Sequence, residues 1–263
     1  MAVYSYSKLS TYEQCPGKYK LRYIDKIKPE IEHTIESFLG KAVHAALEYL
    51  YNQKMRGTLL ALDDVMEYYA NYWNEKYSDD FLIVKQGLTS EDYMNKGIHF
   101  LARYYVRHAP FADKTLAIEK KIFLSLRFDA DLIGFVDRLS YNEKEDLYEV
   151  HDYKTGALKT QKQADVDRQL ALYSLALKEE FKDGKDIRLI WHYLDHDELR
   201  ISVRTDQQLR QLKKEILLMI DEIHEAEKRS TFPFMKSKLC SWCEFKNQCP
   251  EWTKQMTLGA FGK

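Results

Sequence analysis

The sequence predicts a mixed α/β fold in which a central, mostly antiparallel sheet follows a helical region. Apolar residues recur at helical spacing before residue 110, alternate as in strands between 115 and 153, and return to helical spacing after 160. The 263 residues include only 10 Gly and 5 Pro, which excludes long disordered or collagen-like stretches. A chain of this length forms one large domain, or one domain with a sizeable insertion.

The elements are expected in a fixed order along the chain. A short helix begins at Ser7 or Ser10 and ends at Cys15-Pro16, and Gly57, Thr89-Ser90 and Pro110 set the limits of three longer helices. Turn signals at 129–131 and 142–146 separate three strands. The predicted helices are 34–56, 60–77, 91–108, 161–181 and 207–229; the predicted strands are 116–126, 132–141, 147–153, 187–194 and 199–205. The tail after residue 231 has little apolar pattern of its own.

The chain lacks the sequence features of membrane and exported proteins. No run approaches the roughly 20 apolar residues of a membrane span. The first residues contain neither a basic segment nor an apolar one, so nothing indicates export and we expect a cytoplasmic protein. In that compartment four cysteines more often bind metal or stay reduced than form disulfides.

The net charge of −1 hides an uneven distribution. Residues 1–28 carry six basic and two acidic side chains, residues 228–263 carry seven and two, and the middle is acidic. A nucleic-acid partner is therefore not excluded. The cations beside the cysteines form either a positive rim that leads DNA to the site or ordinary solvated charge; they are Lys18, Lys20, Arg22, Lys236, Lys238 and Lys246.

The strand that ends near residue 154 carries a candidate metal site. Asp152 and Lys154 are two residues apart and project to the same side of the strand. The preceding hairpin could bring Asp137 beside them, and two adjacent carboxylates favour a divalent cation. A neighbouring lysine would orient the attacking water or stabilise the transition state. Taken alone, Asp-x-Lys is also typical of a solvated strand end with an ion pair.

Two helical pairs accompany this centre. His44 and Glu48 lie one turn apart on one predicted helix, and Gln169 and Tyr173 have the same spacing on another. Each pair alone also fits an ordinary helix face or a core histidine.

The order of these motifs resembles the RecB-type branch of the PD-(D/E)XK nuclease superfamily. The matching pieces are Gly40-x-x-x-His44-x-x-Leu47-Glu48, Gly134-x-x-Asp137-Arg138, Asp152-Tyr153-Lys154-Thr155-Gly156 and Gln169-x-x-x-Tyr173. The resemblance extends from Leu9 to Pro250 and implies a restriction-endonuclease-like mixed sheet core flanked by helices. It implies a single nuclease domain over 1–263, with a helical insertion or lid over 45–110 and a cysteine-stapled C-terminal tail.

The resemblance also implies a set of site residues. The implied ligands of Mg²⁺ or Mn²⁺ are His44, Asp137, Asp152 and the backbone carbonyl of Tyr153. The implied catalytic residues are Asp137, Asp152 and Lys154, of which the lysine assists the attacking water.

The helix that follows the centre would contact the substrate. By the same resemblance, Gln169 and Tyr173 hold the DNA backbone near the metal. Glu119 lies on the first long strand, where relatives often have an acid, and receives no firm role.

The four cysteines fall into two loops and none into a core-patterned segment. The tail contains Cys240-x-x-Cys243 followed by Cys249-Pro250, and the N-terminal segment contains Cys15-Pro16. Such spacing suits zinc or an iron–sulfur cluster and does not decide between them.

The cysteine pattern resembles the iron–sulfur nucleases of the superfamily, which include the AddB nuclease subunit and CRISPR-associated RecB-like exonucleases. That resemblance implies a [4Fe-4S] cluster on all four cysteines, which joins the tail 230–263 to the segment 1–28. The implied ligands are Cys15, Cys240, Cys243 and Cys249.

The helices between residues 49 and 105 are rich in tyrosine. Aromatic rings can stack on unpaired bases, and a helical lid would suit single-stranded DNA. Helical spacing is also typical of core packing. The rings in question are Tyr49, Tyr51, Tyr68, Tyr69, Tyr72, Trp73, Tyr77, Tyr104 and Tyr105.

The leading functional hypothesis is a metal-dependent DNA exonuclease that hydrolyses DNA ends or single strands in repair, recombination or CRISPR adaptation. The sequence contains no Gly-x₄-Gly-Lys-Ser/Thr loop, so ATP-driven unwinding is expected from a partner such as a helicase or a CRISPR adaptation protein. The alternatives are a non-catalytic DNA-binding iron–sulfur module and an accessory subunit of a helicase–nuclease complex.

Overall fold

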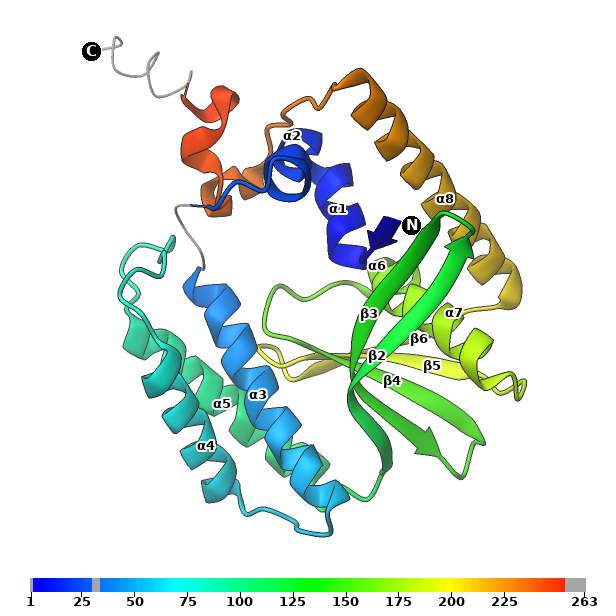
Figure 1. Cartoon of the computed structure of the whole chain (residues 1–263). Helices are drawn as coiled ribbons and strands as arrows, with labels where there is room; N and C mark the ends of the chain where they lie inside the picture. Colours follow the sequence, from blue (N-terminus) through cyan, green and yellow to red (C-terminus); the bar gives the residue numbers. More distant parts are fainter. Residues whose placement is uncertain (1, 30–33, 254–263) are drawn as a thin grey trace.

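A six-stranded mixed sheet flanked by helices organises the molecule (Figure 1). The structure is a computed structural model that describes residues 2–29 and 34–253. The strands follow the order β1-β3-β4-β5-β6, and β2 pairs with β3. The pairs β1/β3 and β4/β5 are parallel and the others antiparallel. The strands are β1 (Ala2–Tyr4), β2 (Lys114–Arg127), β3 (Ala130–Asn142), β4 (Leu147–Lys154), β5 (Ile187–Tyr193) and β6 (Glu198–Val203). The predicted α/β class is confirmed.

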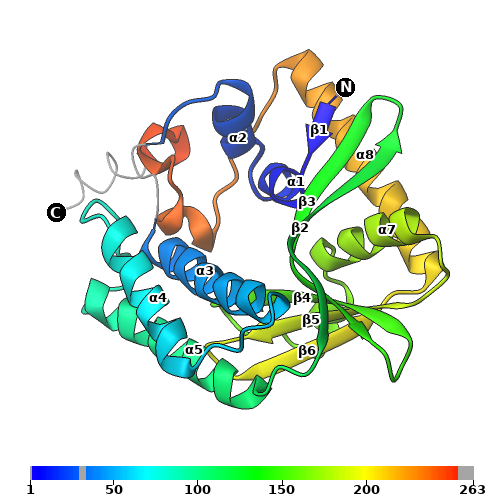
Figure 2. The ribbon, with the colours of Figure 1, turned by 60° about the horizontal axis from the view of Figure 1, so that its bottom comes forward.

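Helices cover both faces of the sheet. Figure 2 shows the α3, α4 and α5 helices together on one side and α7 and α8 on the other. The helices are α1 (Tyr6–Gln14), α2 (Pro16–Tyr19), α3 (Ile35–Met55), α4 (Leu62–Lys76), α5 (Ser90–His108), α6 (Gln161–Asp165), α7 (Gln169–Phe181) and α8 (Asp206–Arg229). A π-helical turn follows α2 at Lys20–Ile24, and two 3₁₀ turns occur at Lys238–Trp242 and Lys246–Gln248. Among the helices of the described ranges, none has the length and apolar character that a membrane crossing requires.

The structure corrects three expectations about the elements. The helix predicted over 161–181 is two helices, because the Asp167 carboxylate accepts a hydrogen bond from Gln169 N and begins α7 anew. Arg204 donates to the Ala164 and Asp167 carbonyls and fixes the break. Strand β1 was not predicted, since three residues show no periodicity. The tail after residue 231, whose weak apolar pattern predicted a loop, contains the two 3₁₀ turns.

Two hydrophobic cores lie on opposite faces of the sheet. One joins α1, α7 and α8 to the sheet and includes Leu172, Trp191 and Ile220. The other joins α3, α4 and α5 to the sheet through Tyr153 and Leu194. Of the tyrosines in these helices, core packing accounts for the buried Tyr51, Tyr69, Tyr93 and Tyr104, whereas Tyr49, Tyr68, Tyr72, Tyr77 and Tyr105 are only partly buried.

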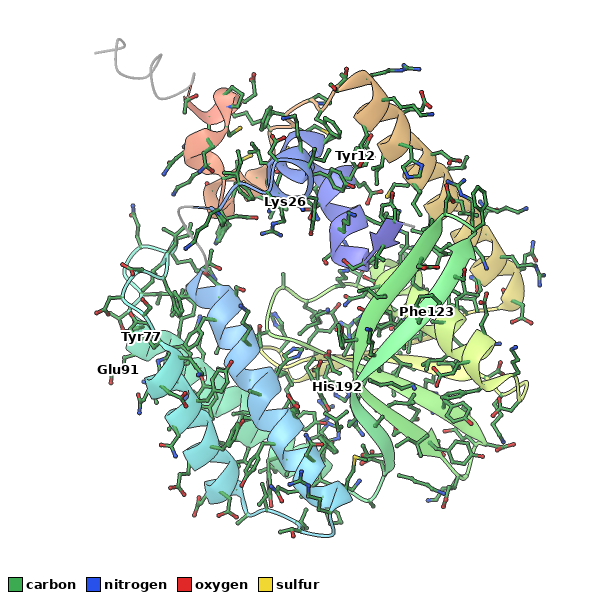
Figure 3. The ribbon with its side chains drawn as sticks, in the orientation of Figure 1. Tyr12, Lys26, Tyr77, Glu91, Phe123 and His192 are labelled. Carbon is green, nitrogen blue, oxygen red and sulfur yellow. The ribbon has the colours of Figure 1, made fainter. Side chains whose placement is uncertain are left out.

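A polar layer is buried between the sheet and the second core. Arg138 is 2% exposed, forms an ion pair with Asp113 and donates to the Tyr153 hydroxyl at 2.9 Å. It also donates to His151 Nδ1 at 2.9 Å, and that atom lies 2.9 Å from His192 Nε2. His192 is buried in the interior of the molecule (Figure 3). Burial, followed by the charge of Arg138, holds the pKa of both histidines well below the usual range. Both rings are therefore neutral, and Arg138 is the central cation of the layer.

Replacing Arg138 by methionine should destabilise the fold strongly. Met preserves much of the volume but removes the donor to the buried Tyr153 hydroxyl and to His151, and it leaves Asp113 with Lys54 as its cation. Each buried group that loses its partner typically costs about 1–3 kcal/mol. Equilibrium unfolding in urea measures the loss. The matched control is Arg127→Met, because Arg127 pairs with Asp129 and Asp221 at the surface, where an ion pair contributes about 0–1 kcal/mol. Equal losses in the two variants would contradict this account of the layer.

Candidate functional site

The candidate site forms where β3 and β4 separate. The last pair of their antiparallel ladder is Arg138 and His151. The next pair in the same register would be Asp137 and Asp152. The Asp137 carboxylate occupies the gap, and its Oδ2 accepts a hydrogen bond from Tyr153 N at 2.8 Å. The side chain thus replaces the backbone acceptor that the missing ladder would have supplied.

Helix α3 brings His44 to this point. His44 Nδ1 lies 3.5 Å from Asp137 Oδ2, and Nε2 donates to the Tyr153 carbonyl at 2.7 Å. Three of the four ligands expected from the sequence therefore meet: an imidazole, a carboxylate and a backbone carbonyl. Donors of these types suit a hard divalent cation.

Glu119 on β2 joins the same group. One ligand atom from each of Glu119, His44 and Asp137 lies within 4.8 Å of the other two. Glu119 has φ of 46°, a left-handed conformation that costs a non-glycine residue about 1 kcal/mol or more. Glu119 had no firm role predicted from the sequence, although the register of the β2–β3 hairpin places it opposite Asp137.

Asp152 and Lys154 form the second half of the site. Lys154 Nζ lies 2.9 Å from Asp152 Oδ1 and 2.7 Å from Oδ2. Asp152 is 3% exposed, and its Oδ2 is buried without a well-aligned hydrogen-bond donor despite the ion pair. A buried carboxylate oxygen with spare acceptor capacity fits a metal ligand.

Helix α7 continues this chain of contacts. Lys154 Nζ also donates to Gln169 Oε1 at 3.0 Å, and Gln169 Nε2 donates to the Tyr173 hydroxyl at 3.4 Å. A side chain at Gly134 would place its Cβ 2.5 Å from the Tyr173 ring. The glycine therefore lets α7 approach β3 closely enough for Tyr173 to reach the site.

The electrostatics of the site favour a bound cation. Burial, together with the Asp152 carboxylate, raises the pKa of Asp137 from its usual 3.8 to about 7. Burial also raises the pKa of Glu119. Burial opposes the charge of Lys154, but the Asp152 carboxylate outweighs it and raises the pKa of the lysine. The carboxylates repel one another, and a divalent ion would relieve that repulsion.

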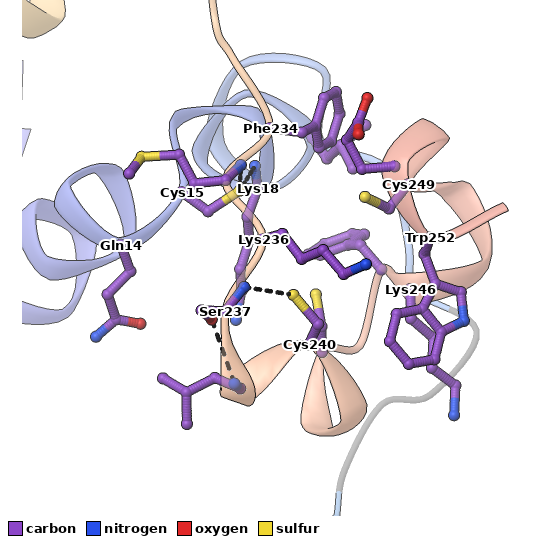
Figure 4. Close-up of a pocket in the computed structure, with 16 residues that line it drawn as sticks. Gln14, Cys15, Lys18, Phe234, Lys236, Ser237, Cys240, Lys246, Cys249 and Trp252 are labelled. Atoms are coloured by element: carbon purple, nitrogen blue, oxygen red, sulfur yellow. Dashed lines mark hydrogen bonds between the residues drawn. The ribbon is translucent and has the colours of Figure 1, made fainter. Parts of the chain in front are cut away.

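The four cysteines line one cavity at the other end of the molecule (Figure 4). The cavity has a volume of about 60 Å³ and lies between α2 and the C-terminal tail. None of the four cysteines, all of which lie in the described residues, forms a disulfide. Cys15 Sγ accepts hydrogen bonds from Lys18 N and Met235 N at 3.4 Å each, and Cys240 Sγ accepts one from Ser237 N at 3.3 Å.

Direct contacts join the N-terminal segment to the tail around this cavity. Gly17 N donates to the Pro233 carbonyl at 2.9 Å. Glu244 forms ion pairs with Lys18 and Arg22, and Lys20 pairs with Asp25. Two acids, Glu244 and Asp25, thus pair with three of the six cations expected to form a positive rim.

A family model decides the family of the chain. The model of the PD-(D/E)XK nuclease superfamily matches residues 3–250. The chain belongs to the PD-(D/E)XK nuclease superfamily. A solved structure of a candidate exonuclease from Eubacterium rectale superposes with a TM-score of 0.53 at 12% identity, covering 95% of this chain and 86% of that one. The restriction-endonuclease-like fold expected from the sequence is confirmed.

A curated relative matches part of the chain. This relative, a subunit of the ATP-dependent helicase/deoxyribonuclease of Carboxydothermus hydrogenoformans, is 29% identical over 175 residues. The match covers 59% of this chain but only 16% of the relative. The shared part is therefore a small fraction of a much longer protein.

The affinity of this PD-(D/E)XK protein for Mn²⁺ should fall as the pH drops below about 7. Below the raised pKa of Asp137 the ion must displace a proton, so the affinity should decrease by up to about tenfold per pH unit. Isothermal titration calorimetry across this range measures the effect. A pH-independent affinity would contradict it.

The same pKa gives a stability test without metal. The folded protein holds the Asp137 proton more tightly than the unfolded chain, so this group lowers the free energy of unfolding as the pH rises from about 4 to 7. In Asp137→Asn that part of the pH dependence should disappear.

Proposed function

We propose that this nuclease hydrolyses DNA phosphodiester bonds with Mg²⁺ or Mn²⁺, held by His44, Asp137, Asp152 and the Tyr153 carbonyl. The observation that carries the proposal is the convergence of His44, Asp137 and Tyr153 beside the Asp152–Lys154 pair. Glu119 is the fifth donor within reach. When bound, a divalent ion neutralises charge at the scissile phosphate and lowers the pKa of the attacking water.

Lys154 acts in this proposal as a cationic donor. Its raised pKa keeps it protonated at neutral pH, so it cannot remove a proton from water. Asp152 and Gln169 hold Nζ from two sides. In that position Nζ orients the water or stabilises the charge that develops on the phosphate oxygens.

Gln169 and Tyr173 hold the DNA backbone in the same proposal. Both side chains emerge from the start of α7, and their amide and hydroxyl groups already contact each other. A phosphate oxygen can replace that weak 3.4 Å contact with a hydrogen bond to either group.

Exonuclease action, on ends or single strands, is the mode we propose. The superposition with a candidate exonuclease and the match to a helicase/deoxyribonuclease subunit support it. The latter relative also supports a helicase partner and a role in repair or recombination. CRISPR adaptation proteins stay a prediction from the sequence.

Asp152→Ala and Lys154→Ala should each reduce Mn²⁺-dependent DNA cleavage by roughly a hundredfold or more, because each removes a charge from the reacting centre. End-labelled single- and double-stranded DNA reports the rate, the polarity and the preferred strand state together. The controls Asp186→Ala and Lys144→Ala remove exposed charges away from the site. Undiminished cleavage by a folded Asp152→Ala variant would exclude the assignment.

We further propose that Cys15, Cys240, Cys243 and Cys249 hold a [4Fe-4S] cluster. The shared cavity and the backbone N–H groups directed at two of the sulfurs support it.

The proposed cluster would staple the tail to the N-terminal segment of the single domain. The Gly17–Pro233 hydrogen bond and the Glu244 ion pairs already join these segments, and a cluster would add covalent cross-links. The helices of the expected insertion, 45–110, lie apart from this staple, against the metal-binding side.

Anaerobically purified protein should contain about four iron atoms per chain and absorb visible light. Cys243→Ser should lose the iron and lower the melting temperature, whereas Ser241→Ala, two residues away, should keep both. Elemental analysis and thermal unfolding measure the two effects. A colourless protein with one zinc ion per chain would refute the iron–sulfur assignment.

A further inference from the structure

An open groove of about 490 Å³ lies between α3 and α4. Helix α3 contributes one stripe of residues at helical spacing, and α4 contributes two tyrosines one turn apart. The stripe consists of Ser37, Gly40, Lys41, His44, Ala45 and Glu48, and the tyrosines are Tyr68 and Tyr72.

The groove leads into the candidate metal site. His44 and Glu48 line both the groove and the smaller cavity that contains Glu119, Asp137 and Tyr153. A molecule in the groove would therefore lie beside an ion held by His44.

The two tyrosines are fixed by packing yet remain partly exposed. Tyr68 stacks almost parallel on Tyr49, with centroids 4.2 Å apart, and Tyr72 stacks on Phe38 at 6.4 Å. Rings held in this way lose little conformational entropy when a further flat group packs against them.

The charges give the groove a direction. Lys41, an exposed residue one turn before His44, favours the binding of a negatively charged DNA backbone at the part of the groove next to the candidate metal site. Glu48 lies between His44 and Tyr68 in the groove. Its carboxylate would repel a phosphate at that position, but it can accept hydrogen bonds from the amino groups of bases. A nucleotide would thus place its phosphate at the metal and its base towards the tyrosines.

We propose that this groove receives the base of an unpaired nucleotide whose phosphate lies at the metal site, which makes the site selective for single-stranded DNA. The inference rests on the proposed nuclease function and adds a substrate class to it. A duplex keeps its bases stacked and paired, so it must first expose one, at a cost of a few kcal/mol.

The test measures binding separately from cleavage. Fluorescence anisotropy of labelled oligonucleotides is recorded with Mn²⁺ in a Lys154→Ala background, which keeps the four proposed ligands of the ion, and Tyr72→Leu and Tyr68→Leu are each added to it. We expect single-stranded DNA to bind about five- to hundredfold more weakly in the leucine variants. Tyr72→Phe keeps the ring and should keep the affinity. Tyr141→Leu is the matched control, since Tyr141 is also partly buried but contacts Asp146 at the far end of β3.

An abasic oligonucleotide tests the same idea without changing the fold. Once the base is absent, the parent and the leucine variants should bind alike. The groove proposal is overturned if the parent and the leucine variants bind normal single strands equally well. It is also overturned if the parent binds no oligonucleotide or binds duplex DNA more tightly than single strands.

The outcomes also separate the two proposals. If the wild-type protein cleaves DNA and Tyr72→Leu cleaves both single- and double-stranded DNA at the same rate as wild type, the groove proposal is wrong and the nuclease function stands. If wild-type protein cleaves no DNA, the nuclease function is wrong, and the anisotropy series decides the groove alone. The Mn²⁺ affinity should be the same in Tyr72→Leu and wild type.

Discussion

The hydrogen bond from Tyr153 N to the Asp137 carboxylate is the contact on which the site depends. It forms because the β3–β4 ladder stops one residue earlier, while β4 continues against β5 as far as Lys154. The strand therefore stays straight after losing one partner, and a side chain satisfies the exposed backbone group. The same contact fixes Asp137 beside His44 and directs the Tyr153 carbonyl towards the histidine.

Because side chains alternate along β3 and β4, one set of residues faces the candidate site and the other faces the buried polar layer. Asp137 and Arg138 are neighbours in sequence, but Asp137 faces the candidate metal ligand His44, whereas Arg138 faces the buried polar layer. On β4, Asp152 and Lys154 face the reacting side while His151 contacts Arg138. Tyr153 serves both sides, since its carbonyl contacts His44 and its hydroxyl accepts from Arg138. Because Tyr153 belongs to both sides, we expect a substitution in the polar layer to shift the positions of the candidate metal ligands His44 and Asp137.

Local spacing explains what the sequence could predict. The long helices and strands, the Asp152–Lys154 pair and the Gln169–Tyr173 pair depend on periods of 3.6 and 2, which a sequence displays directly. Glu119 was missed as a donor because its place depends on hairpin register and an unusual φ. The break before α7 depends on Arg204, nearly forty residues away in the chain. Glu244 neutralises part of the basic end across an even longer separation, which no count of charges by segment reveals.

Under the proposed function, the charge distribution would couple DNA binding to ion binding. Glu119, Asp137 and Asp152 surround the site, and Asp152 forms an ion pair with Lys154. A phosphate approaching the ion-free site meets net repulsion from carboxylates in a partly dehydrated setting, where screening is weak. A divalent ion reverses the sign of that interaction. Thermodynamic linkage then requires DNA to tighten ion binding by the same factor by which the ion tightens DNA binding. Under the proposed function, the acidic middle of the chain would make access of the substrate depend on the bound ion.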